Sequence, residues 1–207
     1  MLKIYGRANS INVRKVLWLC AEAGLTYERF DFGRGFTPTD TPEFLKVSRF
    51  GVVPVIDDDG FILRESNTIT RYLATKHKRE DLFPSDLRQR ASIEAWMDWA
   101  STDLGSAVRD VFWGIQLKHA DFLDPKQIER GVASWSKQMQ RLDQQLATSG
   151  PYMAGAKFTI ADIPVGLSVN RWFSVDFNKP KLDAVAAYYE RLSQRPAYLQ
   201  HGRNGTP

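Results

Sequence analysis

The sequence is poor in the residues that build disulfide frameworks and metal sites. Its 207 residues include one cysteine and three scattered histidines, which excludes an intrachain disulfide and a thiolate metal cage and argues against a zinc site. A single cysteine is typical of a protein kept in a reducing compartment. No apolar run approaches the roughly 20 residues of a membrane-spanning helix, and the amino-terminal residues lack the apolar segment of a secretory signal. We therefore expect a cytoplasmic protein with no metal ion and no membrane partner.

Charge of one sign is not in large excess either. Lysine and arginine number 28 against 24 acidic residues, which gives a net charge of +4. The densest basic run, Lys76–Arg79, is followed at once by Glu80 and Asp81, and such a mixed run at a segment boundary is usually a solvated connector. Nucleic-acid binders instead gather basic residues on one face, so we expect no nucleic-acid partner. A mildly basic protein does favour small anionic ligands.

The first third of the chain alternates between strand and helix patterns. Apolar residues recur at helical spacing from Val13 to Cys20, and the run ends at Gly24, a residue that suits the end of a helix. The tetrad Asp57–Gly60 is typical of the turn of a β-hairpin. The expected order is strand, helix, strand, loop with a short helix, hairpin and helix, at residues 2–5, 13–24, 27–32, 43–47, 52–63 and 66–78.

Strand patterns almost vanish in the rest of the chain. Apolar residues keep helical spacing from Ile93 to Ile115, which predicts one helix of about seven turns. Thr159 and Asp162 are spaced as in a capping box, which predicts the start of another helix. In all, helices are expected around residues 93–115, 125–147, from about 159 onwards, and 181–194.

Three short motifs follow one another along the chain. Residues 51–56 (GVVPVI) contain a proline at a strand entry, residues 65–73 (ESNTITRYL) begin a helix, and residues 158–163 (FTIADI) cap another. Together, in this order and spacing, they resemble the cytosolic glutathione S-transferase family. Residues 9–16 (NSINVRKV) contain a serine two positions before an asparagine and then Lys-Val, which resembles the bacterial, theta-like branch that uses Ser or Thr.

This resemblance implies both a fold and an enzyme. It implies an α/β N-terminal thioredoxin-like domain at residues 1–78 that binds glutathione, a linker at 79–86, and an all-helical C-terminal domain at 87–207 that forms the electrophile site. The enzyme would be a cytoplasmic homodimer active in detoxification, which activates glutathione as a thiolate for attack on small hydrophobic electrophiles. Two alternatives keep the fold: a glutathione-dependent disulfide or peroxide reductase, and a non-catalytic ligand-binding protein.

Pro54 stands at the entry to a strand, where an X-Pro bond can be cis and turn the chain sharply. In the family this bond is cis and leaves the backbone of the preceding residue free to pair with the cysteinyl amide of glutathione. The resemblance therefore implies this role for Val53 and Pro54. A proline on an edge strand without a ligand is the alternative.

Glu65 and Ser66 lie at a strand-to-helix turn, where the N–H groups of a helix start attract a carboxylate. The resemblance implies that the hydroxyl and amide of Ser66 hold the γ-glutamyl carboxylate of glutathione, and that Glu65 lies near the γ-glutamyl ammonium. Ser66 also suits a plain helix cap, and the two roles are compatible.

The thiol of glutathione needs help to ionise, because thiols with a pKa near ~8.5 are mostly protonated at neutral pH. A hydroxyl at the start of the first helix would stabilise the thiolate by a hydrogen bond and by the helix dipole. Ser10 lies there, and the resemblance implies that Ser10 is the catalytic residue and that Asn12 is a secondary donor. Tyr5 is the competing candidate, because animal classes use a tyrosine at the end of the first strand. A plain helix cap is the structural alternative for Ser10.

Several further residues bear on the site. Cys20 falls on the apolar stripe of the first helix, and a buried free cysteine usually behaves as a small hydrophobe. Many relatives carry Lys or Gln at the position of Val52, so the glycyl carboxylate needs another partner, with Arg34 and Lys46 as candidates. Phe50 matches an aromatic residue that some classes insert into the partner subunit, or it is an ordinary loop aromatic. Candidates for an aromatic wall of the electrophile site, or alternatively for plain core, are Trp99, Phe112, Trp113 and Trp172.

Overall fold

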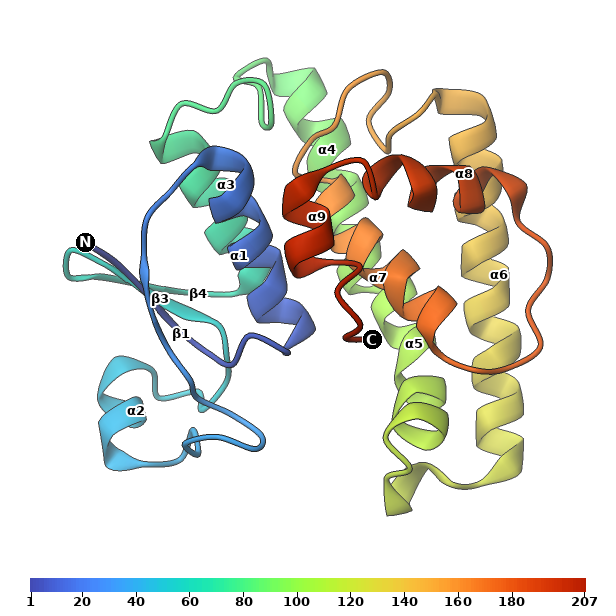
Figure 1. Ribbon diagram of the computed structural model, residues 1–207, viewed down its shortest axis with the longest axis horizontal. Helices are drawn as coiled ribbons and strands as arrows, with labels where there is room; N and C mark the ends of the chain where they lie inside the picture. The colour runs from blue at the N-terminus through green and yellow to red at the C-terminus, as the bar shows by residue number, and fades with distance from the viewer.

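The computed structural model describes all residues from Met1 to Pro207 and divides them into an α/β part and a helical part (Figure 1). The α/β part contains β1 (Leu2–Tyr5), α1 (Ile11–Ala23), β2 (Glu28–Phe30), α2 (Pro42–Val47), β3 (Val55–Asp58), β4 (Phe61–Arg64) and α3 (Ser66–Lys76). The expected order of strands and helices is confirmed, and so is the thioredoxin-like character of this part.

The four strands form one mixed sheet in the order β2-β1-β3-β4. β1 is parallel to β2 and antiparallel to β3, and β3 is antiparallel to β4. Because alternate residues of a strand face opposite sides, Leu2 and Ile4 enter the main core with α1 and α3. Tyr5 instead packs on the other face, beside a small cluster that includes Phe32 and Phe44. The two faces of the sheet thus have separate cores.

The β3–β4 hairpin differs from its expected limits. Asp57 and Asp58 belong to β3, so the turn consists of Asp59 and Gly60 alone. An acidic residue is tolerated in this strand because α3 satisfies it: Tyr72 Oη donates to Asp58 Oδ2 at 2.6 Å, and Lys76 forms an ion pair with the same carboxylate. The strand also begins only after Pro54, not at Val52.

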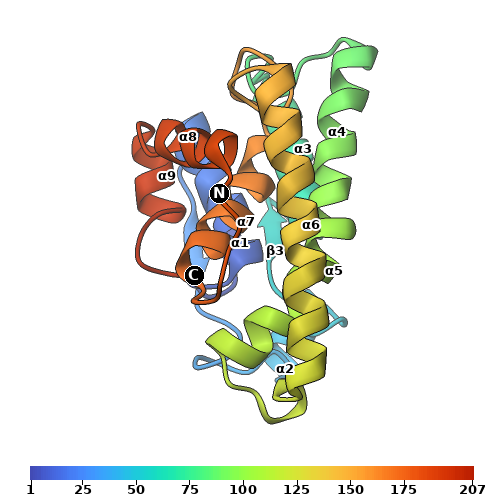
Figure 2. The ribbon, with the colours of Figure 1, turned by 90° about the vertical axis from the view of Figure 1, so that its right-hand side faces the viewer.

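The helical part has a bundle around a buried helix. Its elements are α4 (Leu87–Ser101), α5 (Asp103–Val111), the π-helical turn η1 (Phe112–Gln116), the 3-10 turn η2 (Ala120–Phe122), α6 (Pro125–Ser149), α7 (Asp162–Ser174), α8 (Asp183–Leu192) and α9 (Pro196–His201). Figure 2 shows α6 running alongside α5, against which it packs. Ten of the 13 residues of α7 are buried, as expected for the central helix of a bundle. None of the helices combines the length and the apolarity needed to cross a membrane.

The single long helix expected from Ile93 to Ile115 is wrong, because the chain breaks at Thr102. Thr102 has φ −94° and ψ −80°, outside the helical region. Its hydroxyl donates to the carbonyl of Asp98 at 2.9 Å and contacts the carboxylate of Asp103 at 3.1 Å. The same kind of hydroxyl-to-carbonyl bond occurs within α7, between Ser168 and Pro164, without a break, and the N–H of Thr102 still bonds to the carbonyl of Asp98 at 2.9 Å. Apolar residues keep helical spacing across the break, so the sequence pattern gave no indication of it.

The other helices agree closely with expectation, apart from α9, which was not predicted. At the start of α7, the carboxylate of Asp162 accepts the N–H of Thr159 at 2.8 Å, which is one half of the expected capping box. The hydroxyl of Thr159 accepts the N–H of Ala161 instead, at 3.3 Å.

The two parts share one core. A cluster of buried apolar residues runs from β1 and α1 through α7 to α8 and α9. The two parts approach closely at Gly166 in α7, where a Cβ would lie 3.0 Å from the Trp18 ring of α1. α3 ends at Lys76 and α4 begins at Leu87, and domain limits at residues 78 and 87 stay a prediction.

Candidate functional site

The candidate site begins at the amino end of α1, where Ser10 precedes the helix. Ser10 has extended backbone angles (φ −80°, ψ 127°), and its carbonyl accepts the N–H of Arg14 at 2.9 Å. Its hydroxyl does not cap the helix, and the residue is 9% exposed. The hydroxyl therefore makes no bond to the helix and lies at the positive end of the helix dipole. An anion at this point would be stabilised both by a hydrogen bond from the hydroxyl and by the dipole.

The loop that leads into β3 lies beside this helix end. The Val53–Pro54 peptide bond is cis, and neither the N–H nor the C=O of Val53 bonds to another backbone group. A Cβ on Gly6 would lie 3.1 Å from Val53 Cβ and 2.5 Å from Val13 Cγ2, so only glycine lets the end of β1 pass this close. Val53 thus has free backbone hydrogen-bonding groups close to the first turn of α1.

The third component is the amino end of α3. Glu65 precedes the helix with φ 70°, a left-handed conformation that is uncommon outside glycine and frequent at binding sites. No side chain caps α3, so its first N–H groups are available to a ligand. Ser66 is buried and donates its hydroxyl to Asn12 Oδ1 at 3.5 Å. The starts of α1 and α3 are therefore in direct contact.

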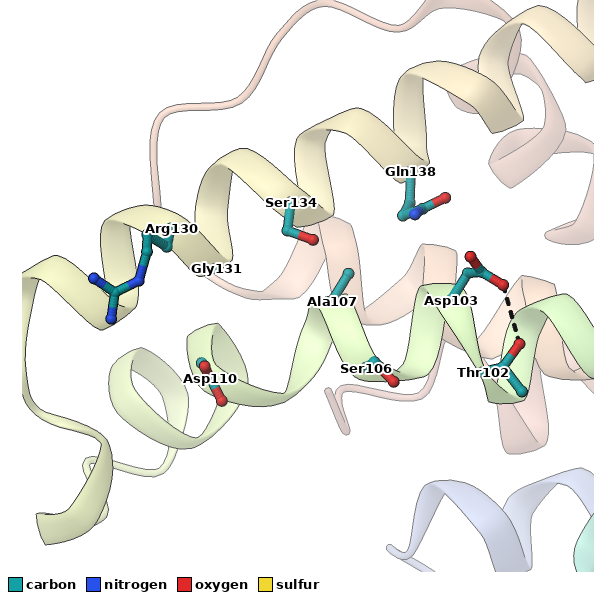
Figure 3. A pocket seen from close by; sticks show the side chains of 9 residues that line it. All are labelled: Thr102, Asp103, Ser106, Ala107, Asp110, Arg130, Gly131, Ser134 and Gln138. Atoms are coloured by element: carbon teal, nitrogen blue, oxygen red, sulfur yellow. Dashed lines mark hydrogen bonds between the residues drawn. The ribbon is translucent and has the colours of Figure 1, made fainter.

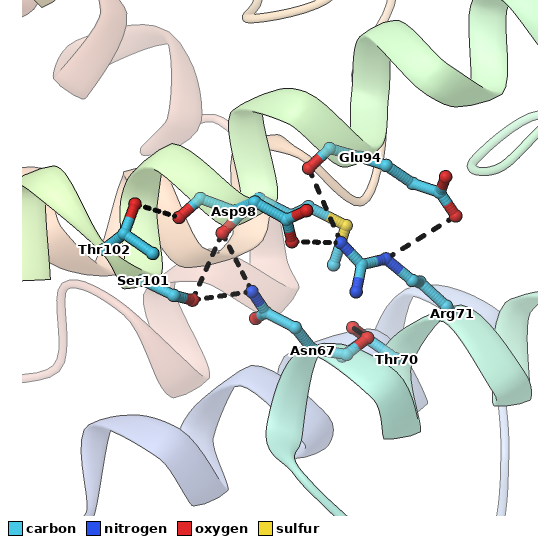
Figure 4. A network of polar contacts seen from close by, with 8 residues as sticks. Asn67, Thr70, Arg71, Glu94, Asp98, Ser101 and Thr102 are labelled. Atoms are coloured by element: carbon cyan, nitrogen blue, oxygen red, sulfur yellow. Dashed lines mark hydrogen bonds and ion pairs between the residues drawn. The ribbon is translucent and has the colours of Figure 1, made fainter.

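A polar network holds the start of α3 against the helical part (Figure 4). Asn67 Nδ2 donates to the carbonyl of Met97 at 2.9 Å and to Ser101 Oγ at 2.8 Å. One turn later, Arg71 Nη2 pairs with Asp98 Oδ1 at 2.6 Å. These contacts cross from α3 to α4, so they fix the orientation of Ser66 relative to the helical bundle.

A cavity of about 350 Å³ opens between the two parts. Three of the expected site residues line it: Asn12, Glu65 and Ser66. Ser10, Val53 and Pro54 lie outside its lining. From the helical part, α4, α5, η1 and α7 supply the remaining wall, which includes Ala100, Ser101, Gly105, Val108, Arg109, Phe112, Trp113, Ser168 and Arg171.

Two of the four candidate wall aromatics line this cavity. Phe112 and Trp113 are among its lining residues. Trp172 is buried and packs edge-on against Trp135 at 5.1 Å between ring centroids, so it belongs to the core. Trp99 packs edge-on against Trp96. Helical spacing in the sequence did not distinguish the aromatic residues that line the cavity from those that pack in the core.

The cavity also contains two cations that the sequence analysis missed, Lys15 and Arg171. Burial and, to a smaller extent, the charge of Arg171 lower the pKa of Lys15 to about 8, while Glu65 opposes the shift. Burial likewise lowers the pKa of Arg171 to about 9, with a contribution from Arg14. Lys15 lies one helical turn from Asn12, which was a usable signal. Nothing in the sequence near Arg171 pointed to the cavity.

Tyr5, the competing candidate, and Cys20 are both packed in cores. The Tyr5 ring stacks on Phe30 at 5.2 Å between centroids, on the sheet face away from α1. Cys20 is fully buried, and burial raises the pKa of its thiol to about 12. A thiol with this pKa is not a nucleophile at neutral pH.

The loop before β3 is exposed. Phe50 is 63% exposed, and only the guanidinium of Arg64 covers its ring, at 3.8 Å from the centroid. Val52 is half exposed, and Lys46 is exposed. Arg34 Cζ lies 4.7 Å from the centroid of the Trp113 ring, so this arginine reaches across to the helical part of the molecule.

A second, larger cavity of about 560 Å³ lies between α5 and α6 (Figure 3). Its lining is polar and contains Asp103, Asp110, Arg130 and Gln138, but none of the expected site residues. No group of three or more His, Cys, Asp or Glu side chains is arranged to hold a metal ion. The cavity between the two parts is therefore the candidate site.

Comparison with known proteins gives a consistent result. Residues 1–75 match the family model described as "Glutathione S-transferase, N-terminal domain". Over 199 residues, the chain is 32% identical to "Glutathione S-transferase GstB" of Escherichia coli (strain K12), which covers 95% of each chain. "Glutathione S-transferase 4" of Zea mays is 28% identical over 95% of this chain and 89% of its own.

One solved structure matches this chain along nearly its whole length. The theta class glutathione S-transferase from the citrus canker pathogen Xanthomonas axonopodis pv. citri, with glutathione bound, superimposes with a TM-score of 0.90. It is 36% identical to this chain and covers 97% of it and 96% of its own chain.

Proposed function

The chain belongs to the glutathione S-transferase family, and we propose that it activates the thiol of glutathione for attack on electrophilic small molecules. The observation that carries the proposal is the Ser10 hydroxyl, which is free of the helix at the amino end of α1. A thiolate placed there would accept the hydroxyl hydrogen bond and lie at the positive end of the dipole. Both effects favour the thiolate over the thiol.

We assign the binding of glutathione to three places around Ser10. The free N–H and C=O of Val53, presented by the Val53–Pro54 turn, pair with the cysteinyl amide. The N–H of Ser66 holds the γ-glutamyl carboxylate, together with its hydroxyl once this turns from Asn12 to the ligand, since the uncapped start of α3 attracts an anion. Glu65, which lines the same cavity as Ser66, attracts the γ-glutamyl ammonium. Asn12, which accepts the Ser66 hydroxyl, links this end to α1 and serves as a secondary donor.

The reaction needs no covalent enzyme intermediate. The thiol proton leaves to solvent, the thiolate sulfur forms a bond to the electrophilic carbon, and the leaving group departs with its electron pair. The protein supplies the stabilised thiolate and the proximity of the two reactants. The electrophile binds in the cavity beside Phe112 and Trp113.

The assembly and location follow from the same residues. We propose a homodimer in which the exposed Phe50 inserts into the partner subunit. We place the enzyme in the cytoplasm, where glutathione and protein thiols are kept reduced. We also propose a glutathione-binding domain at residues 1–78, a linker at 79–86 and a helical domain at 87–207, because no helix or strand spans residues 77–86.

The test is conjugation of glutathione to 1-chloro-2,4-dinitrobenzene at neutral pH. We expect the wild type to be active and Ser10→Ala to lose about 10- to 100-fold in kcat/KM, the value of a hydrogen bond to a charged group. Tyr5→Phe is the matched control, because it also removes one hydroxyl, and its kcat/KM is expected to stay within about twofold since the ring packs in a separate core. Loss of activity in Tyr5→Phe but not in Ser10→Ala would reverse the assignment.

A further inference from the structure

Lys15 is a buried cation without a partner. It lies on α1 one turn from Asn12, is 8% exposed, and lines the cavity between the two parts. Its ammonium forms no ion pair with an acidic side chain of the chain, unlike those of Lys3, Lys76 and Lys181. Burying an unpaired charge is costly, so a lysine in this position implies a ligand that pairs with it.

Arg171 of α7 is also a buried cation without an acidic partner, and it lies on the wall of the cavity that the helical part forms. Its Nε is buried without a hydrogen-bond partner, and its guanidinium lies over the Phe112 ring with Cζ 3.7 Å from the centroid. The aromatic ring holds the guanidinium in place but does not neutralise it. Two cations therefore share one cavity, and each lowers the cost of binding an anion there.

The nearby acid does not cancel these charges. Glu65 is the one carboxylate in the lining of the cavity, and its Oε1 is paired with Arg64 at 2.8 Å. In the proposed function this carboxylate attracts the ammonium of glutathione. Arg109, a third cation of the lining, is paired with Asp110 at 2.9 Å. The unpaired positive charge of the cavity is thus the charge of Lys15 and Arg171.

We propose that the electrophile of this enzyme carries a carboxylate, which Lys15 and Arg171 bind while Phe112 and Trp113 contact its apolar part. The inference rests on the proposed function and narrows its substrate class to aromatic or apolar electrophiles with an acidic group. Arg171 belongs to the helical part and lies over Phe112, on the side of the cavity that the proposed function gives to the electrophile.

The test compares two electrophiles that differ in one charge. In 4-chloro-3,5-dinitrobenzoate and its methyl ester, the thiolate sulfur bonds to the same ring carbon, and chloride leaves with the electron pair. Each enzymatic kcat/KM is divided by the uncatalysed rate constant with glutathione, which removes the difference in ring reactivity. We expect the wild type to favour the carboxylate by about tenfold or more, the value of one charge-assisted hydrogen bond.

Substitutions of Lys15 and Arg171 test whether these two cations cause the preference for the carboxylate over the ester. Lys15→Met and Arg171→Met each keep an apolar stem, and each is expected to lower the normalised kcat/KM for the carboxylate about tenfold while the ester changes less than about twofold. Lys137→Met is the matched control, because it removes one positive charge from an exposed position outside the cavity. It should leave the preference intact.

Each contrary result has a distinct meaning. Equal normalised rates for the two electrophiles in the wild type would overturn the inference and leave the proposed function standing. An increase in the KM for glutathione with both electrophiles would overturn it too, because the cations would then serve glutathione. No conjugation of either electrophile would overturn the proposed function. Calorimetric binding of 3,5-dinitrobenzoate against 3,5-dinitrobenzamide tests the anion preference without turnover or variants, and equal affinities would overturn the inference.

Discussion

Tyr5 and Ser10 are close in the sequence, but their hydroxyls lie in different environments. The Tyr5 ring stacks on Phe30 in the core that α2 covers, whereas Ser10 lies at the start of α1 beside the cavity. The alternation of side chains along β1 decides this difference, because Ile4 faces α1 and its neighbour Tyr5 faces away. At the scale of single residues, the structure therefore favours the serine as thiolate stabiliser.

Cys20 gives a prediction at this scale. Its thiol is fully buried, and burial raises its pKa to about 12. We expect the native protein to resist 5,5′-dithiobis(2-nitrobenzoate) and to keep its conjugating activity after long incubation, because only a thiolate reacts. The unfolded protein should release one equivalent of the coloured thiol, matching its one cysteine. Rapid modification of the native protein with loss of activity would instead support cysteine-based chemistry.

The sequence motifs predicted Ser10, Glu65 and Ser66 as site residues, because these residue types suit helix starts that local patterns mark. Their roles stay predictions. Lys15 and Arg171 were not predicted as site residues. Their importance depends on burial without a partner, a property of the packed molecule that no spacing rule contains.

At the scale of elements, the start of α7 depends on one buried carboxylate. Asp162 accepts the N–H groups of Met153 at 2.9 Å and Thr159 at 2.8 Å, and the hydroxyl of Tyr188 at 2.9 Å. Burial raises the pKa of Asp162 to about 6, and these hydrogen bonds oppose the shift. The carboxylate therefore connects the preceding loop, α7 and α8.

Asp162→Ala should destabilise the protein strongly. It leaves three buried donors without an acceptor, and we expect the free energy of unfolding to fall by about 3 kcal/mol or more. Asp183→Ala is the matched control, since Asp183 also begins a helix but is exposed and paired only with Lys181. Its effect should stay within about 0.5 kcal/mol. Urea denaturation measures both, and equal effects would contradict the role given to Asp162.

The errors in the predicted elements have local physical causes. The break at Thr102 is a change of backbone angles at one residue, and apolar spacing does not register such a change. The length of β3 depends on Tyr72 and Lys76 satisfying Asp58 from α3, a contact distant in the sequence. By contrast, α1 and its end at Gly24 (φ 66°) were predicted because periodicity and a glycine cap agree.

At the scale of the whole molecule, α1 joins the two parts. Arg14 Nε donates to the carbonyl of His201 at 2.6 Å, and Arg195 pairs with Glu22 through two hydrogen bonds of 2.8 and 2.6 Å. These contacts fix α9 on α1.

His201 makes this contact sensitive to acid. Burial and the charge of Arg14 lower its pKa from 6.5 to about 4. In that interval the unfolded chain binds a proton that the folded protein does not, so stability is lost as the pH falls from 6.5 towards about 4. Urea denaturation at several pH values should show a shallower loss for His201→Gln than for the wild type. Identical slopes would mean that His201 does not contribute.

The central claim is that Ser10 stabilises the thiolate of bound glutathione, and the ultraviolet absorbance of the thiolate against pH tests it most directly. We predict that glutathione bound to the wild type ionises below its pKa in solution, and that Ser10→Ala binds glutathione without lowering the thiol pKa. If the variant lowers the pKa as far as the wild type does, another donor or the helix dipole alone stabilises the thiolate, and the assignment of Ser10 is wrong.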